Sequence, residues 1–513
     1  MHPSFGSQWP RRAGLVLCAL LATLVAPSAR AQTVEDAAWQ KIRERWFTIE
    51  INGQRAGWAG DLLYDDGERY MMVSDQMISV ARGDSDVATV SVSIASIEMH
   101  DGAPVEIRQS RRLGHEPEIT MWVFAGETVE RISRQNGREV RAEEELASRS
   151  EPWFMPHAAE LFEKARREAG AEAIKYRSID TSAGLRIITV SQAKSGETTH
   201  QLGERVVPVE IWTVRKSAEP DNILSETTVH VAGDGEVVFA EEVAGAMRFT
   251  VRSASREEAQ RALVAAPELL AQTTVRPSRR IAGAAATVAA TYRLRAGAGV
   301  LQAFPRAGSQ RAEAQDDGAV LLTIDTRDPL AASEDEIADA RYRAASTVID
   351  CDDPAIVELA RGAVSEARDA TDSAKAEALR RAVHRHISRK DLASAFASAS
   401  ETVRSRSGDC SEHSVLLCAM LRAQEIPARV TSGLVYAESF AGQRHVFAWH
   451  MWTQALIDGR WIDLDATVEG PFSAAHILAG VTDLSSGAMG DEITRLVSLM
   501  GNLDIEVVSV EHR

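Results

Sequence analysis

The stretch SRSGDCSEHSVLLC, residues 405–418, places a cysteine directly after a Ser-Gly-Asp turn and at the head of an apolar run. Asp409 is a good N-cap residue, so a helix is predicted to begin at Cys410, to run to about Ala423 and to be closed by Ile426-Pro427. The amides and dipole of a first helical turn favour negative charge, which predicts a thiol pKa shifted toward the reactive thiolate. The alternatives are that Cys410 is a small buried hydrophobe or a metal ligand.

A second stretch, RHVFAWHMWTQALIDGRWIDLDAT at residues 444–467, offers an imidazole and carboxylates. Two apolar runs flank Asp458-Gly459, which predicts a β-hairpin with those two residues in the turn. In that register His450 and Asp465 project to the same face as diagonal neighbours, about 7 Å apart at Cβ and within reach of a hydrogen bond. The same face carries Trp452, which we interpret as packing, and Asp463.

A thiol at a helix start, with an imidazole and a carboxylate on adjacent strands, predicts cysteine-dependent acyl transfer. His450 would take the thiol proton, and the sulfur of Cys410 would attack an amide carbonyl. His450 would then protonate the leaving amine while Asp465 fixes its tautomer, and water or a second amine would resolve the thioester. The backbone amide of Cys410 is a candidate donor to the oxyanion.

The same motifs resemble a known family. SRSGDCSEHSVLLCAMLRAQEIPARVTSGLVY, followed by HMW and WIDLDAT, is similar to the transglutaminase-like superfamily of papain-like fold over residues 345–500. The resemblance implies that Cys410 is the nucleophile, His450 the base and Asp465 the third member, acting on a peptide or protein substrate without a cofactor or metal. Two departures are Ala466, where proline often follows the aspartate, and Glu425, where glycine often precedes Ile-Pro.

The N-terminus has the pattern of a secretory signal peptide. Arg11 and Arg12 precede an uncharged apolar run, residues 13–26, and Ala29-Arg30-Ala31 is a cleavage signature. The run is shorter than the roughly 20 residues of a membrane span. We therefore expect cleavage after Ala31 and a soluble, secreted or periplasmic protein without a stable membrane span.

Charge and cysteine content narrow the function classes further. Removing the leader deletes three arginines and no acids, so the net charge changes from -17 to -20, which argues against a nucleic-acid partner. Three cysteines remain, and Cys410 and Cys418 would lie about 12 Å apart along one helix, too far for a disulfide. A bridge from Cys351 stays open, and the oligomeric state is not fixed by the sequence.

The predicted fold class is α+β, with an antiparallel β-rich region (a curved sheet or half-barrel) followed by a transglutaminase-like α+β domain. Residues 139–170 are predicted to be largely helical, and residues 254–272 are predicted to form a helix. His384 and His386 are interpreted as surface residues. The predicted organisation is a signal peptide at 1–31, a β-rich domain at 32–253, a helix, linker and small β unit at 254–333, and the transglutaminase-like domain at 334–513.

Two other functions remain open. One is a non-catalytic binding or scaffold protein that uses this fold and the β-rich region for interaction. The other is a zinc site built from Cys410, His413, His450 and Asp465, although the compact Cys-x-x-Cys pairs of structural zinc sites are missing. His413 is otherwise expected to support the site or to pack.

Overall fold

The structure, a computed structural model, describes residues 39–81, 87–113, 116–126, 128–135, 137–144, 146, 152–182, 184–219, 222–268, 274–297, 303–389, 396–484, 499 and 501–513. The predicted signal peptide and its cleavage site lie outside these residues. Among the described helices, none has both the length and the apolar character needed to cross a membrane.

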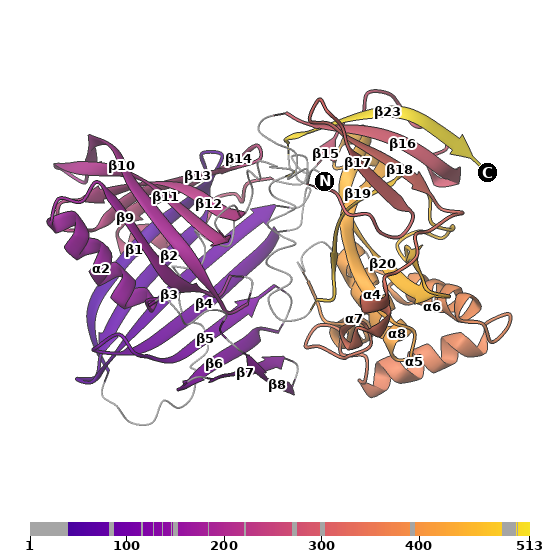
Figure 1. Ribbon diagram of the computed structural model, residues 1–513, viewed down its shortest axis with the longest axis horizontal. Helices are drawn as coiled ribbons and strands as arrows, with labels where there is room; N and C mark the ends of the chain where they lie inside the picture. The colour runs from indigo at the N-terminus through magenta and orange to yellow at the C-terminus, as the bar shows by residue number, and fades with distance from the viewer. Residues whose placement is uncertain are drawn as a thin grey trace, which may run out of the picture.

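A 14-stranded sheet in which every pair of neighbours is antiparallel forms the N-terminal part of the structure. The chain makes one meander from β1 to β8 and a second from β9 to β14, and β1 joins them by pairing with β14. The sheet is strongly curved (Figure 1), so the predicted antiparallel, curved β-rich region is confirmed. Its strands are β1 (Gln40–Ile51), β2 (Gln54–Asp65), β3 (Arg69–Ala81), β4 (Val87–Met99), β5 (Pro104–Arg112), β6 (Glu118–Ala125), β7 (Thr128–Gln135), β8 (Arg138–Glu144), β9 (Ala173–Asp180), β10 (Arg186–Leu202), β11 (Arg205–Glu219), β12 (Asn222–Ala232), β13 (Val237–Ala244) and β14 (Met247–Ala254).

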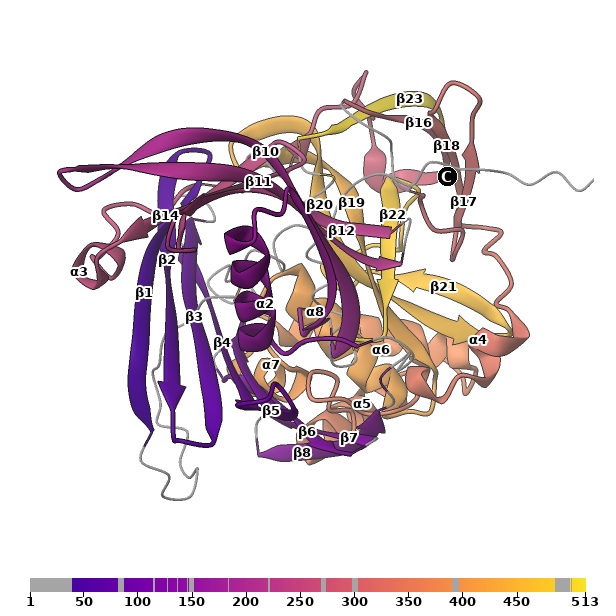
Figure 2. The same cartoon turned by 60° about the vertical axis from the view of Figure 1, so that its left-hand side comes forward.

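Helix α2 (Pro156–Glu168) lies in the hollow of this curved sheet (Figure 2). Its N-terminus is held by Glu98 of β4, whose carboxyl oxygens accept from the amides of His157 and Ala158 at 3.3 and 2.8 Å. Burial raises the pKa of Glu98 to about 7. Farther along the helix, Glu160 pairs with Arg43 and with Arg45 of β1, each at 2.7 Å. The helix is therefore fixed to the sheet by polar contacts at two points.

The prediction of a largely helical segment at 139–170 is wrong at its start, because residues 138–144 form β8. Glu144 of β8 accepts hydrogen bonds from the indole of Trp122 at 3.2 Å and from Arg131 at 2.5 Å. These partners lie on β6 and β7, so cross-strand contacts have overridden the helical propensity of the Glu-rich stretch.

The helix predicted at 254–272 is also wrong for most of its described length. Only α3 (Arg256–Ala259) forms, capped by the Ser255 side chain. The guanidinium of Arg55 donates hydrogen bonds to the carbonyl oxygens of Glu258 and Ala259, at 2.7 and 2.6 Å, in the last turn of this helix. Residues 260–268 are mostly exposed, so a longer helix would have no apolar face to bury there.

A four-stranded sheet, ordered β17-β18-β16-β23, contains the predicted small β unit. Its fourth strand comes from the end of the chain, since β23 pairs with β16. Tyr292 and Leu294 of this sheet share an apolar core with Phe447 and Ile477 of the next sheet, so the small unit packs directly on its neighbour. Its strands are β16 (Thr287–Ala296), β17 (Gln310–Ala314), β18 (Val320–Asp325) and β23 (Leu503–His512), and β15 (Thr274–Val275) and η2 (Ala284–Ala286) precede them in the chain.

The remaining elements surround one central helix, α8. In the sheet beside it the order is β15-β20-β19-β22, with β21 paired to β20. Every residue of α8 from 411 to 422 is buried, because α5, α6 and α7 cover the sides that the sheet leaves free. Helix α8 is thus enclosed on all sides from Ser411 to Arg422. The elements are α4 (Glu334–Ala338), η3 (Ala340–Tyr342), α5 (Pro354–Ser365), α6 (Asp372–His386), α7 (Ala399–Ser405), α8 (Cys410–Arg422), β19 (Ala428–Phe440), β20 (Gln443–Ile457), β21 (Arg460–Leu464) and β22 (His476–Thr482).

The 14-stranded sheet is in contact with the part that contains α8. Leu113, just after β5, packs against the core around α8, and its carbonyl accepts from the amide of Phe396 at 3.3 Å. Thr347 donates to Glu118 of β6 at 2.9 Å. The end of β5 and the start of β6 therefore lie against the segments that lead into α5 and α7.

Candidate active site

The predicted hairpin places His450 beside Asp465. Strands β20 and β21 pair with Ile457 opposite Arg460, so Asp458-Gly459 form the turn as predicted. Asp465 follows β21 directly, and its Oδ2 lies 2.9 Å from Nε2 of His450. The expected imidazole–carboxylate contact is thus present in the structure.

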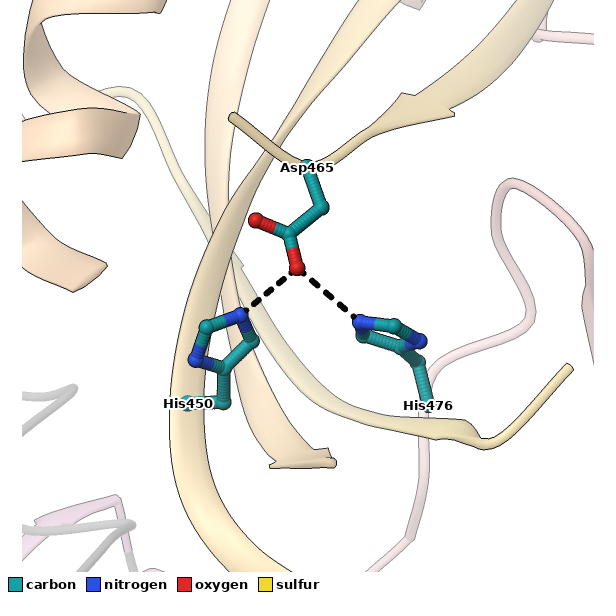
Figure 3. A group of neighbouring side chains, drawn as sticks. All are labelled: His450, Asp465 and His476. Carbon is teal, nitrogen blue, oxygen red and sulfur yellow. Dashed lines mark hydrogen bonds and ion pairs between the residues drawn. The ribbon is translucent and has the colours of Figure 1, made fainter. Parts of the chain in front are cut away.

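Asp465 is enclosed by hydrogen-bond donors. Its Oδ1 accepts from the amide and the hydroxyl of Thr467 at 2.8 and 2.6 Å. Its Oδ2 faces His450 and a second imidazole, that of His476, at 3.2 Å (Figure 3). Burial alone would raise the pKa of Asp465, but the charge and hydrogen bond of His450, followed by those of His476, hold it well below its usual range. Asp465 is therefore an ionised carboxylate.

The carboxylate of Asp465 has the largest raising effect on the pKa of His450. Burial alone would lower the pKa of His450, but Asp465, with a smaller contribution from Cys410, raises it to about 10. The imidazolium that forms when His450 accepts a proton from Cys410 is therefore stable through neutral pH and loses that proton only as the pH rises through about 10. His450 can therefore take a proton from a neighbour and keep it.

Cys410 begins α8, as the sequence predicts. Asp409 is the N-cap, and its side chain accepts from the amide of Ser411 at 2.8 Å. Glu412 completes a capping box by accepting from the amide of Asp409 at 2.8 Å. A Cβ atom at Gly408, where φ is 156°, would lie 2.4 Å from Cβ of Glu412, so only glycine fits before this cap.

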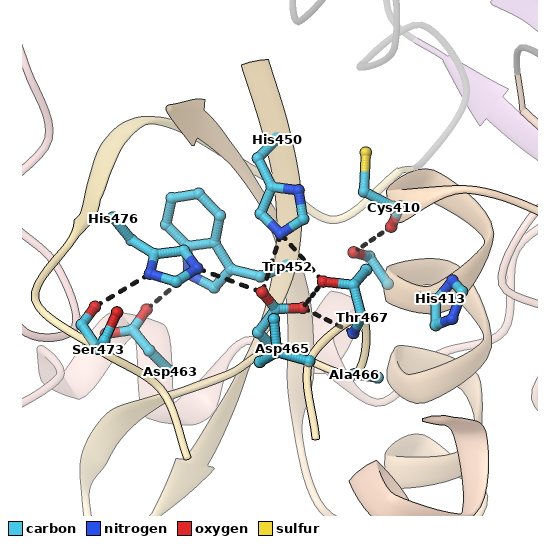
Figure 4. A network of polar contacts seen from close by, with 12 residues as sticks. Cys410, His413, His450, Trp452, Asp463, Asp465, Ala466, Thr467, Ser473 and His476 are labelled. Carbon is cyan, nitrogen blue, oxygen red and sulfur yellow. Dashed lines mark hydrogen bonds and ion pairs between the residues drawn. The ribbon is translucent and has the colours of Figure 1, made fainter. Parts of the chain in front are cut away.

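The prediction of a lowered thiol pKa is wrong in direction. Although Cys410 keeps some exposed surface, burial of the thiol raises its pKa, and the charge of Asp409 raises it further. The hydrogen bonds to His450 and to the backbone amide of Met451 lower the pKa of the thiol, but by less than burial and Asp409 raise it. Cys410 lies beside the ring nitrogen of His450 that points away from Asp465, so His450 stands between the thiol and the carboxylate (Figure 4).

Residues 357–466 match the family model described as the transglutaminase-like superfamily. The chain contains a transglutaminase-like domain. The matched range includes all three predicted site residues and is shorter than the range of the resemblance, 345–500. It ends before His476.

Three solved structures resemble the chain at low identity. A candidate cysteine protease from Cytophaga hutchinsonii is 15% identical, with 44% of this chain and 89% of that chain covered and a TM-score of 0.28. A β-barrel-like protein of a domain of unknown function from Brucella abortus is 11% identical, with 41% and 95% covered and a TM-score of 0.31. The periplasmic domain of TgpA from Pseudomonas aeruginosa is 15% identical, with 38% and 88% covered and a TM-score of 0.24. A search of curated proteins finds no match.

Two further residues of the transglutaminase-like hairpin, Trp452 and Asp463, lie beside the site. Trp452 is buried and nearly parallel to the ring of His450, with centroids 6.3 Å apart, and its indole donates to Asp463 at 2.9 Å. The other oxygen of Asp463 accepts from the amide and hydroxyl of Ser309, both at 2.8 Å. Asp463 thus binds a distant loop, whereas Asp465 binds the imidazole.

His413, His384 and His386 do not join His450 and Asp465. The Nδ1 of His413 lies 2.6 Å from the carbonyl oxygen of Asp409, one turn earlier in its own helix, and Figure 4 shows its ring on the side away from His450. His384 and His386 are half-buried rather than on the surface, and their rings contact the carbonyl oxygens of Ala466 and Val403 at 3.0 and 2.9 Å. The zinc set proposed from the sequence is not assembled.

The described part of the chain contains one group that could hold a metal ion, formed by His450, Asp465 and His476, with ligand atoms within 4.8 Å of one another. Both Nε2 atoms contact the same carboxylate oxygen at hydrogen-bond distances. A cation would have to displace the protons from both contacts. The spacing of these atoms is accounted for by direct hydrogen bonds.

Sequence reasoning missed two residues that hold this site. His476 starts β22, eleven residues after Asp465, and only a histidine at the head of an apolar run marks it in the sequence. Arg380 of α6 is buried and donates to the carbonyl oxygens of Asp465, Val468 and Glu469 at 3.2, 2.6 and 2.9 Å. Neither contact follows from a local sequence pattern.

Proposed function

We propose that the protein is an exported, cysteine-dependent acyl-transfer enzyme that hydrolyses or transamidates peptide or amide bonds through Cys410, His450 and Asp465. The observation that carries the proposal is the order of these three groups. The thiol begins a capped helix, the imidazole stands beside it, and a carboxylate binds the far nitrogen of that imidazole at 2.9 Å. This is the arrangement that thiol-based acyl transfer needs.

The proposed reaction moves one proton at each step. His450 accepts the proton of Cys410, and the thiolate sulfur bonds to the carbonyl carbon of the substrate. The carbon–nitrogen bond then breaks as His450 returns the proton to the leaving amine, which leaves a thioester on Cys410. Water or an amine attacks this thioester, His450 takes the proton of the attacking group and gives it to the departing sulfur, and the product is an acid or a new amide.

The first turn of α8 contributes to the same reaction. Its backbone amides point toward the helix start, and the amide of Cys410 is the proposed donor to the oxyanion that forms on the substrate carbonyl. The charge and hydrogen bond of Asp465 raise the pKa of His450 to about 10, which supports a role as base. Export of the enzyme is supported by the basic, apolar and Ala-x-Ala segments of residues 11–31.

The experiment is a glutamine-containing peptide library assayed for hydrolysis and for amine incorporation. Cys410→Ala and His450→Ala should each lower kcat/KM by at least about a hundredfold, because nucleophile and base are removed in turn. The control for Cys410→Ala is Cys351→Ala, because Cys351 is a buried cysteine outside the site. The control for His450→Ala is His445→Gln, because His445 lies on the same strand as His450. Activity should also fall as the pH rises through about 10, where His450 loses its proton.

A non-catalytic binding or scaffold protein is the alternative, and the 14-stranded sheet in contact with the transglutaminase-like domain favours it. Cys410→Ser separates the two functions. A loss of cellular function in this variant supports the enzyme. An unchanged phenotype, together with peptide turnover that does not differ between the wild type and Cys410→Ala, would show that the fold is used for binding.

A further inference from the structure

His476 is a second imidazole on the carboxylate of Asp465. It begins β22 and pairs with Val435 of β19, the strand that lies between β22 and the strand of His450. Its Nε2 is 3.2 Å from Oδ2 of Asp465, the same oxygen that binds His450 (Figure 3). Asp465 therefore lies between two imidazoles that come from different strands.

The partners of His476 determine where its protons are. Its Nδ1 lies 3.0 Å from the carbonyl oxygen of Ser473, which can only accept a hydrogen bond. Its Nε2 faces the Asp465 carboxylate, which also only accepts, since its charged form is strongly favoured. Both ring nitrogens must then donate, and an imidazole that donates from both nitrogens carries two protons and a positive charge.

The surroundings of His476 hold the ring in place. The residue is 4% exposed, its ring packs on Phe472 with centroids 4.2 Å apart, and Trp452 meets it edge-on at 5.4 Å. The titratable groups that contact it are Asp465 and His450, whose ring centroid is 5.7 Å away. Asp463 does not contact His476 directly; its carboxyl group accepts the indole N–H of Trp452, which lies between them. Aromatic faces favour a neighbouring cation, so the enclosure is compatible with a charged ring.

We propose that His476 is a buried imidazolium that positions and neutralises Asp465, and so completes a charge-balanced chain of Cys410 thiolate, His450 imidazolium, Asp465 carboxylate and His476 imidazolium. The inference rests on the proposed function, because it assigns a role in the ionised state of the same site. Without His476 the buried chain would carry a net negative charge once the thiolate forms. The second imidazolium removes that imbalance and favours the thiolate in a site whose burial disfavours it.

The test uses the pH dependence of Cys410 alkylation by iodoacetamide, which needs no substrate. His476→Gln keeps an N–H donor for Asp465 but removes the charge, so the thiolate becomes less favourable. The pH profile of Cys410 labelling should shift to higher pH, with slower labelling at pH 7, because the buried chain loses a positive charge while the thiolate keeps its negative one. His476→Phe removes the donor as well, so it should also lower the maximal rate of peptide turnover, whereas His445→Gln should leave both readouts unchanged.

Proton-coupled nitrogen NMR of the wild-type protein tests the same point without a substitution. Two protonated ring nitrogens on His476 at neutral pH are expected, and a single protonated nitrogen would overturn the inference. The inference would also be overturned if His476→Gln still unfolded cooperatively and its Cys410 labelling profile were the same as that of the wild type. It would be overturned, too, if the wild-type protein bound one metal ion per chain and the His476→Gln variant bound none. If the wild-type protein turned over no peptide while His476→Gln still shifted the pH profile of Cys410 labelling, the proposed enzyme function would be contradicted but the role of His476 would stand.

Discussion

At the scale of single residues, Cys410 shows which of two opposing effects decides its acidity. A helix N-terminus stabilises a negative group by about 0.3–1 kcal/mol, less than about one pKa unit. Burial can change a pKa by several units. Burial and the neighbouring charge of Asp409 therefore outweigh the helix dipole, and the pKa of Cys410 is raised. The thiolate depends on specific partners, His450 and the amide of Met451, rather than on the helix start alone.

Asp409→Asn tests this balance at one residue. Asparagine caps helices about as well as aspartate, so α8 should keep its start while the charge beside the thiol disappears. Alkylation of Cys410 at pH 7 should become about threefold faster, because the thiolate fraction increases. Asp353→Asn, the same change at the N-cap of α5, is the matched control and should leave the rate unchanged. Slower labelling in Asp409→Asn would show that the charge does not raise the pKa.

At the scale of elements, the loop after β21 decides where Asp465 lies. The carboxylate is outside the regular strand, so β-sheet pairing does not fix it. Arg380 of α6 instead holds the carbonyl oxygens of this loop, and its own guanidinium is paired with Glu377 at 2.8 Å. Because the side chain is buried, these bonds are shielded from water and each orphaned carbonyl would carry a full desolvation cost.

Arg380→Met should lower the free energy of unfolding by about 2–4 kcal/mol and reduce peptide turnover, since the loop that carries Asp465 loses its hydrogen-bond partners. Thermal unfolding and kcat are the measurements. Arg381→Met is the control, because Arg381 pairs with the same Glu377 at 2.7 Å but is 53% exposed and should cost less than about 1 kcal/mol. Equal effects of the two substitutions would contradict a specific role for the buried arginine.

At the scale of the whole molecule, Asp463 joins parts of the chain that are far apart in sequence. Its carboxyl oxygens accept from Ser309, in the loop before β17, and from Trp452 and Gln454 of β20. Strand β17, which follows Ser309, belongs to the four-stranded sheet, and this sheet also contains β23, the last strand of the chain. The hairpin that carries His450 and Asp463 is therefore in contact with a loop that lies more than a hundred residues earlier in the sequence.

Asp463→Asn should destabilise this junction by about 2–4 kcal/mol, because the amide nitrogen would face donors that now bind a carboxyl oxygen. The expected result is a lower midpoint of thermal unfolding with Cys410 labelling at pH 7 unchanged in the folded state. Asp458→Asn in the exposed hairpin turn is the control, since asparagine tolerates the left-handed conformation found there, with φ of 50°. An unchanged midpoint in Asp463→Asn would show that the junction does not depend on this residue.

Local sequence patterns were sufficient for a large part of the fold. The helix at Cys410 begins after Asp409, and the hairpin turns at Asp458-Gly459, both as predicted. Glu425 has a φ of 63°, and this left-handed conformation is the local reason why glycine is often found at that position of the pattern. These features depend on contacts within a few residues, so the order of residues alone encodes them.

The sequence by itself thus determined the antiparallel β-rich region, the transglutaminase-like domain, and the residues Cys410, His450 and Asp465 as the candidate site. Only the tertiary structure decided the direction of the thiol pKa, the second imidazole of His476 and the buried guanidinium of Arg380. The physical reason is that burial and charge pairing depend on groups brought together across dozens of residues. A local pattern specifies which helix or strand a side chain belongs to, and the assembled fold specifies what surrounds it.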